Sequence, residues 1–103
     1  MNQPITLDDI RAARERIAGH VQPLRITRSE SLSQRFERDI LLAHEYLQTT
    51  GAFKLRGATN AVLQLPPAAS GVTAVSTGNH GRGLAYAAKQ LFLLSPQAKK
   101  DAP

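Results

Sequence analysis

Residues 71–83 read GVTAVSTGNHGRG, and within this stretch the pattern of the chain changes from strand to helix. The β-branched residues within 71–76 predict a strand, and the glycines that follow predict a turn over 78–83. The alanine-rich residues after the turn predict a helix over 84–94. A strand followed by a helix is the repeating unit of α/β folds.

The same order of elements occurs once earlier in the chain. The apolar run 40–42 predicts a buried strand, and apolar residues at helical spacing predict a helix from Phe53 to Leu65 that Pro66 ends. Because strand and helix alternate from residue 40 onward, the sequence predicts an α/β fold with a parallel sheet. Upstream, Thr6 and Ser29 are candidate N-caps of two further helices.

The composition excludes several classes of protein. The chain has 103 residues, which corresponds to one small domain, and it contains no cysteine for a disulfide framework, a zinc finger or a thiol nucleophile. No apolar run approaches the roughly 20 residues that span a bilayer. Residues 1–4 do not resemble a secretory signal. These features predict a cytoplasmic protein with no membrane partner.

The net charge of +5 comes from 13 Lys and Arg against 8 Asp and Glu. Basic residues are scattered among acidic ones and form no long block of like charge. This scatter favours a solvated surface over a stripe that follows a phosphate backbone. The sequence therefore predicts no nucleic-acid partner.

Lys54 is the first residue with a candidate chemical role. It follows Gly51 and Phe53 at the start of a predicted helix. If the amine is partly buried, desolvation and the charge of Arg56 favour its neutral form, which Schiff-base chemistry requires. The alternative is a surface lysine whose ammonium is in water, and the local sequence by itself favours this alternative.

The turn after residue 76 is the second candidate site. Backbone N–H groups at the start of a helix form a ready site for a carboxylate or phosphate. Ser76, Thr77 and Asn79 add side chains that hydrogen-bond. The order of the glycines differs from the dinucleotide-binding fingerprint, so a Rossmann nucleotide site is not predicted. The alternative is a flexible connection in which Ser76 or Thr77 only caps the helix.

The three histidines, His20, His44 and His80, lack the spacing of metal ligands, so no metal site is predicted. Only His80 lies in a candidate site.

Together these two stretches resemble a known family. Residues 45–58, which contain GAFKLRGA, are similar to the pyridoxal-phosphate (PLP) lysine motif of the serine/threonine dehydratases, which have the tryptophan synthase β-like fold type II. Residues 71–88 are similar to the asparagine loop and the following helix of the same family. The sequence STGNHGR at 76–82 most resembles the hydroxyectoine-utilisation dehydratases. The resemblance covers about residues 5–90.

The resemblance implies a partial three-layer α/β fold with a parallel sheet and a role for each motif residue. Lys54 would be the catalytic Schiff-base lysine, Phe53 would pack against the cofactor ring, and Asn79 would hydrogen-bond the ring hydroxyl. The implied reaction is α,β-elimination from L-threonine or L-serine, which gives a 2-oxo acid and ammonia. The residues implied to bind the substrate carboxylate are Ser76, Thr77, Gly78, Asn79 and His80.

The chain also departs from the family pattern. Ala43 and Tyr46 stand where the family usually has Lys and Asn, and the pattern is lost after Gln90. The glycine loop that holds the cofactor phosphate is absent from this chain. We therefore expect residues 1–94 to be an N-terminal fragment of a dehydratase domain, followed by a divergent, disordered tail over 95–103. We expect the isolated chain to be inactive.

A small nucleic-acid-binding module of the KH type is the alternative function. Gly78-Asn79-His80-Gly81 matches the Gly-x-x-Gly loop of that module, and the chain is basic. Such a loop joins two helices, whereas a predicted strand precedes it here. The dehydratase resemblance is preferred. It implies an amino acid as the small-molecule partner and homo-oligomers for full-length relatives.

Overall fold

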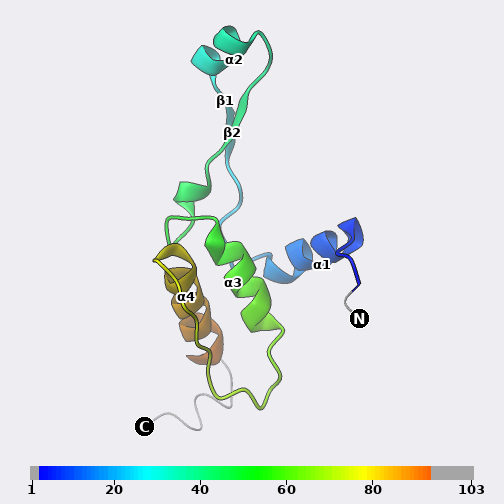
Figure 1. The fold of residues 1–103 in the computed structure, drawn as a ribbon, viewed down its shortest axis with the longest axis vertical. Coiled ribbons are helices and arrows are strands. Elements are labelled where there is room, and N and C mark those ends of the chain that lie inside the picture. Colours follow the sequence, from blue (N-terminus) through cyan, green and yellow to red (C-terminus); the bar gives the residue numbers. More distant parts are fainter. Residues whose placement is uncertain (1–2, 94–103) are drawn as a thin grey trace.

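The structure is a computed structural model that describes residues 3–93, so the predicted tail over 95–103 lies outside the described residues. Figure 1 shows helices α3 and α4 side by side, with α1 beside α3 and an arm that extends away from them. The arm makes the molecule 57 Å long, against 26 Å in its shortest direction. The elements in order are α1 (Leu7–Ile17), β1 (Ile26–Arg28), α2 (Glu30–Phe36), β2 (Leu41–Ala43), the 3-10 helix η1 (Glu45–Leu47), α3 (Lys54–Leu63) and α4 (Asn79–Leu93).

Helix α1 begins after Thr6, as the sequence predicts. The Asp9 N–H donates to the Thr6 hydroxyl at 3.2 Å, and the Thr6 N–H donates to the Asp9 carboxylate at 2.8 Å. This reciprocal capping box holds the first turn of the helix. The bond from the Thr6 backbone N–H to the Asp9 carboxylate, and after it the Thr6 side chain, hold the pKa of Asp9 below its ordinary value of 3.8.

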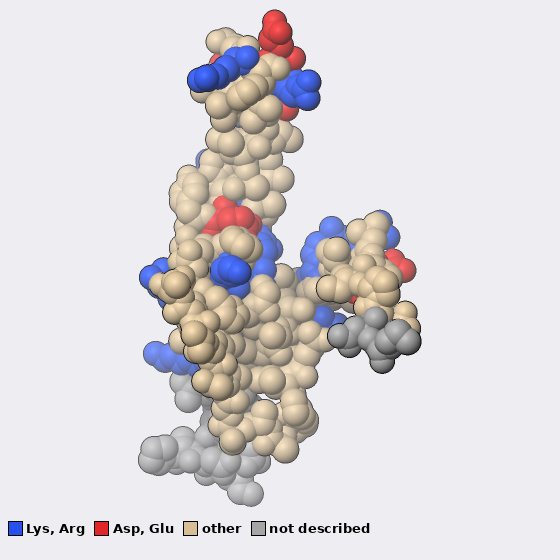
Figure 2. Space-filling model, in the orientation of Figure 1, with Lys and Arg blue, Asp and Glu red and all other residues tan. Residues whose placement is uncertain are grey.

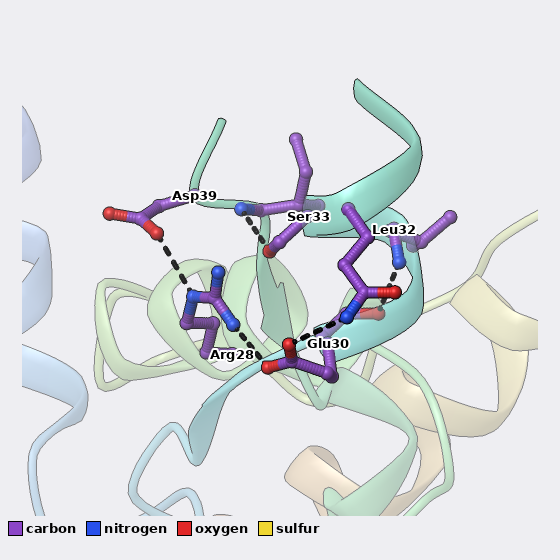
Figure 3. A network of polar contacts seen from close by, with 8 residues as sticks. Arg28, Glu30, Leu32, Ser33 and Asp39 are labelled. Carbon is purple, nitrogen blue, oxygen red and sulfur yellow. Dashed lines mark hydrogen bonds and ion pairs between the residues drawn. The ribbon is translucent and has the colours of Figure 1, made fainter. Parts of the chain in front are cut away.

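The arm consists of β1, α2 and β2. Helix α2 begins at the predicted cap, where the Ser29 hydroxyl accepts a hydrogen bond from the Leu32 N–H at 3.3 Å. The buried Ser33 hydroxyl accepts the Ile40 N–H at 2.9 Å, which ties the helix to the chain just before β2 (Figure 3). Arg28 bonds to carboxylates on both sides of the helix, Glu30 at 2.6 Å and Asp39 at 2.9 Å. These polar contacts close the tip of the arm.

The sheet differs from the predicted one. Residues 41–43 form a strand, but β2 is exposed and pairs antiparallel with β1, with Thr27 opposite Leu42. Residues 71–76 are exposed and make no strand. The predictions of a buried strand at 40–42, a strand at 71–76 and parallel pairing between them are therefore wrong for the described residues. A strand is stabilised by a neighbour, and β-branched residues alone do not supply one.

The small apolar core lies between α3, α4 and the end of α1. Leu55 is fully buried, with 0% of its surface exposed. The other buried apolar residues are Ile17, Ala58, Val62 and Ala87. Helix α3 runs as the apolar spacing predicts, and it ends shortly before Pro66. Most of the apolar packing is therefore between α3 and α4, the two helices that carry the candidate site.

Helix α4 begins earlier than predicted. The glycine-rich residues 79–83 form its first turn rather than a turn before the helix. The Arg82 N–H donates to the Gly78 carbonyl at 2.9 Å, which is the first helical hydrogen bond. The prediction of a helix that begins at Leu84 is therefore wrong. Glycine disfavours a helix when only local propensity is considered, but here Gly81 and Gly83 both lie against other parts of the chain.

Charged side chains are distributed over the molecule. On the face shown in Figure 2, basic groups lie on the arm, on α1 and on the body, with acidic groups among them. No helix among residues 3–93 is long and apolar enough to cross a membrane.

The capping box predicts how the stability of α1 depends on pH. A carboxyl group whose folded pKa is depressed contributes stability that is present above its unfolded pKa and is lost as the pH falls through the folded pKa. We therefore expect α1 to keep its first turn at neutral pH and to fray below pH 3.8, the ordinary pKa of this group.

NMR titration of the Asp9 side-chain carbon measures this pKa directly. The Thr6→Ala variant removes the hydroxyl bond and should raise the midpoint towards the ordinary value. Asp9 in the parent chain is the reference. An Asp9 midpoint that is the same in Thr6→Ala as in the parent chain would contradict the assignment of the cap.

Candidate active site

A tight loop positions Lys54 as the first residue of α3. The Gly51 N–H donates to the Gln48 carbonyl at 2.8 Å, and Gly51 has a φ of +80°, which favours glycine. Three residues later α3 begins, with Phe53 at its N-cap position. The amine of Lys54 lies 5.4 Å from the centroid of the Phe53 ring, within the range of a cation–π contact.

Gly83 brings helix α4 close to this same turn of α3. A Cβ atom at Gly83 would lie 3.3 Å from Cα and N of Leu55 and 3.4 Å from the carbonyl carbon of Lys54. Gly83 is buried, and its lack of a side chain lets the two helices meet backbone to backbone. The start of α4 therefore lies next to the start of α3.

One open cavity joins the two motifs. It has a volume of about 600 Å³ and is lined by Lys54, by Val75, Ser76 and Thr77, and by Asn79 and His80. This volume falls within the roughly 300–1,000 Å³ of ordinary small-molecule sites. Residues more than twenty positions apart in the sequence thus share one site.

Ser76 caps the start of α4. Its hydroxyl oxygen accepts the N–H of Gly78 at 3.1 Å and the N–H of Gly81 at 3.0 Å. A Cβ at Gly81 would contact Cβ of Ser76 at 3.4 Å, so the helix turns closely around this side chain. Because the oxygen accepts two hydrogen bonds, its own O–H is left to donate. Together with the positive end of the helix dipole, this donor favours an anion in the cavity.

The structure brings together most of the residues that the sequence predicts for the site. Lys54, Ser76, Thr77, Asn79 and His80 line the cavity. Lys54 itself is exposed, which agrees with the surface lysine that the local sequence by itself favours.

Two further predicted residues lie beside the cavity and are not among those that line it. Phe53 is 57% exposed and contacts the lysine. Gly78 links Thr77 to the first residue of α4.

The other two histidines lie elsewhere. His20 follows α1, and its N–H donates to the Ile17 carbonyl. The His44 ring lies between the hydroxyls of Thr27 (2.6 Å) and Tyr46 (3.1 Å) at the base of the arm.

Val75 and Glu45 were missed by sequence reasoning. Val75 lines the cavity, although it reads in the sequence as an ordinary strand residue. Glu45 forms two hydrogen bonds with Arg56, at 2.8 and 2.9 Å. This pairing raises the pKa of Arg56, mainly through the hydrogen bond to Glu45, and it directs the guanidinium to the carboxylate. The acidic side chain at position 45 indicates in the sequence that an ion pair can form there. The neighbouring residues do not show which Arg or Lys is its partner.

A protein that places a lysine amine beside the N-terminus of a second helix can bind a carbonyl compound that also carries an anionic group. Residues 17–94 match the family described as pyridoxal-phosphate dependent enzyme. The chain belongs to this family.

Similar proteins are dehydratases, deaminases and racemases. A protein of Sinorhizobium fredii assigned as a threonine dehydratase is 54% identical over 87 residues, which are 82% of this chain and 26% of that protein. The catabolic L-threonine dehydratase of Escherichia coli is 39% identical over 90 residues, which are 85% of this chain and 27% of that protein. The chain thus spans about a quarter of the length of these relatives.

Solved structures confirm the fold class. The crystal structure of a T.th. threonine deaminase superposes with a TM-score of 0.76 at 41% identity, over 84% of this chain and 31% of its own. A pyridoxal 5'-phosphate-dependent aspartate racemase superposes with a TM-score of 0.79 at 34% identity, over 99% of this chain and 36% of its own. The chain is therefore a partial α/β structure of PLP fold type II.

The residues of the cavity fit the reactive end of PLP. The cofactor carries an aldehyde that a lysine amine can bind and a ring hydroxyl that an amide can hydrogen-bond. Lys54 and Asn79 offer these groups in one cavity of suitable size.

The close contact at Gly83 makes a prediction about stability and site geometry. Gly83→Ala adds a methyl group 3.3 Å from the Leu55 backbone, which cannot move as a flexible side chain does. We expect a loss of about 1–3 kcal/mol in the free energy of unfolding, as for other overpacked cores.

Gly57→Ala is the matched control, because it lies in α3 with no atom within 4 Å of the new Cβ. It should stabilise the chain by up to about 1 kcal/mol through helix propensity. Urea denaturation followed by circular dichroism measures both. Equal stability of Gly83→Ala and the parent chain would show that the two helices do not pack in this way.

Proposed function

We propose that this chain carries the lysine and substrate-carboxylate half of a PLP-dependent dehydratase that acts on hydroxy-amino acids of the L-threonine or L-serine class. The observation that supports this most strongly is the shared cavity, which Lys54 and the residues at the start of α4 line together. The reaction would be α,β-elimination of water, followed by release of ammonia and a 2-oxo acid. The relatives named as threonine dehydratases support the same chemistry.

PLP, when bound, supplies the electron sink for the reaction. Lys54 would hold the cofactor through Nζ, Phe53 would lie against its ring, and Asn79 would donate to its ring hydroxyl. When the substrate amine displaces it from the cofactor, Nζ of Lys54 would be free to take the proton from the α-carbon of the substrate as a general base.

The start of α4 would bind the substrate carboxylate. The free O–H of Ser76, the hydroxyl of Thr77 and the backbone of Gly78 supply donors, and the helix dipole adds a positive end. Asn79 and His80 line the same cavity and would complete this set. A carboxylate fixed at this point would hold the α-carbon near the lysine.

The branch of the family is a further part of the proposal. The sequence STGNHGR at 76–82 favours the hydroxyectoine-utilisation dehydratases. Serine and aspartate racemases are also among the similar proteins. Both reaction types begin with loss of the same α-proton, so the product separates them: a 2-oxo acid from elimination, a D-amino acid from racemisation.

We propose that the chain by itself does not turn over substrate. The cavity is open, Lys54 and Phe53 are exposed, and Val75 at its wall is 104% exposed. Water then competes with the substrate carboxylate for the hydrogen-bond donors at the start of α4. Elimination depends on a site that excludes water.

The KH-like alternative has less support. Its Gly-x-x-Gly loop joins two helices, but here Gly78 follows an extended segment, and residues 79–81 belong to α4. An amino acid as partner, the lack of nucleic-acid, membrane and metal partners, a cytoplasmic location and homo-oligomers of full-length relatives remain predictions.

Covalent labelling tests the assignment of the lysine. The chain is incubated with PLP and reduced with borohydride, and the adducts are mapped by peptide mass spectrometry. We expect Lys54 to be labelled several times faster than Lys89, an exposed lysine on α4 of the same chain that serves as the internal control. Equal labelling of the two lysines would count against the site.

The same sample tests the proposed inactivity. L-threonine and L-serine should give no 2-oxo acid above the background of free PLP. Turnover that is lost in Lys54→Ala would refute the proposed inactivity and at the same time support the role of the lysine.

A further inference from the structure

One ion pair ties the helix that carries Lys54 to the segment before it. Arg56 donates from Nε to Oε2 of Glu45 at 2.8 Å and from Nη2 to Oε1 at 2.9 Å. A bidentate bond of this kind fixes both distance and orientation. The two side chains are 30% and 23% exposed, whereas the other ion pairs among residues 3–93 have partners that are 44–91% exposed. This pair is therefore the least accessible to water of those described.

The pair acts at the end of α3 that has no cap of its own. Phe53 is at the N-cap position and offers no side-chain hydrogen bond to the helix, in contrast to Thr6 of α1 and Ser29 of α2. Before it lies a loop that turns at Gly51. The bond to Glu45, eleven residues earlier, closes this loop and connects the first turn of α3 to η1.

Arg56 and Lys54 point to different sides of the helix. Residues two positions apart in an α-helix are separated by about 200° around its axis. Arg56 reaches η1, whereas Lys54 lines the cavity with Ser76 and Asn79. Fixing Arg56 on one side therefore sets the direction in which Lys54 leaves the helix on the other.

We propose that Arg56 and Glu45 are a positioning pair that directs the amine of Lys54 into the cavity at the start of α4. This inference rests on the proposed function, because it gives the pair the role of orienting the Schiff-base lysine. Neither side chain lines the cavity, so neither is a catalytic residue. Loss of the pair should let the first turn of α3 rotate and fray, and the amine should then spend less time beside the α4 donors.

The test uses the full chain and compares the initial rates at which PLP and borohydride label Lys54 and Lys89. In Glu45→Gln, which keeps the size of the side chain and removes its charge, we expect the ratio of the two rates to fall roughly fivefold. The matched control is Glu30→Gln, which breaks the Arg28–Glu30 pair in the arm and should leave the ratio unchanged. The exchanged pair Glu45→Arg with Arg56→Glu should recover most of the ratio.

A separate measurement distinguishes positioning from a general loss of stability. Circular dichroism shows whether each variant keeps the helix content of the parent chain. A ratio in Glu45→Gln equal to that of the parent would overturn the proposal, and so would an exchanged pair no better than the single variant.

A second measurement does not depend on the cofactor. NMR cross-peaks between the Lys54 side chain and residues 76–80 should be present in the parent chain and in Glu30→Gln, and lost in Glu45→Gln. If these cross-peaks behave as expected while PLP labels Lys54 and Lys89 equally in the parent chain, the pair positions the lysine and the proposed function fails. If labelling of the parent is selective and the cross-peaks persist in Glu45→Gln, the positioning proposal fails alone.

Discussion

At Gly83 the backbone of α4 lies against the backbone of Lys54 and Leu55, so closely that a methyl group would fit only if this backbone shifted by a few tenths of an ångström. Leu55 is fully buried at the same place, so this backbone contact lies at the core residue that is most completely buried. A contact at this position fixes the start of α4 relative to the start of α3. The candidate site is built at those two helix starts, and its geometry depends on this contact.

Polar contacts hold the first turns of the two helices in place. The Ser76 hydroxyl holds the first turn of α4 through two N–H groups, and the Glu45–Arg56 pair holds the first turn of α3. The result is a lysine amine and a set of anion-binding donors in one cavity. The arm, by contrast, is held by its own ion pairs and contributes no residue to that cavity.

Features that depend on a few neighbouring residues could be predicted from the sequence. Features of this kind are the caps at Thr6 and Ser29 and the extent of α3. The family resemblance also predicted that the lysine motif and the asparagine loop share one site. Strand pairing could not be predicted, because it depends on which segments lie side by side. Residues 71–76 have the composition of a strand, but within the described residues no strand lies beside them, and β2 pairs with β1 instead. Gly81 and Gly83 read as turn residues, since local propensity cannot show that a helix needs them for close contacts.

The central claim is that α4 meets α3 at Gly83, and through-space NMR measures this contact most directly. In the uniformly labelled chain, the account predicts a strong cross-peak between the α-protons of Gly83 and the α-proton of Leu55, because a Cβ at Gly83 would be only 3.3 Å from Cα of Leu55. Weaker cross-peaks should connect the start of α4 with Lys54. A folded chain in which both helices are present but the Gly83–Leu55 cross-peak is absent would contradict the account.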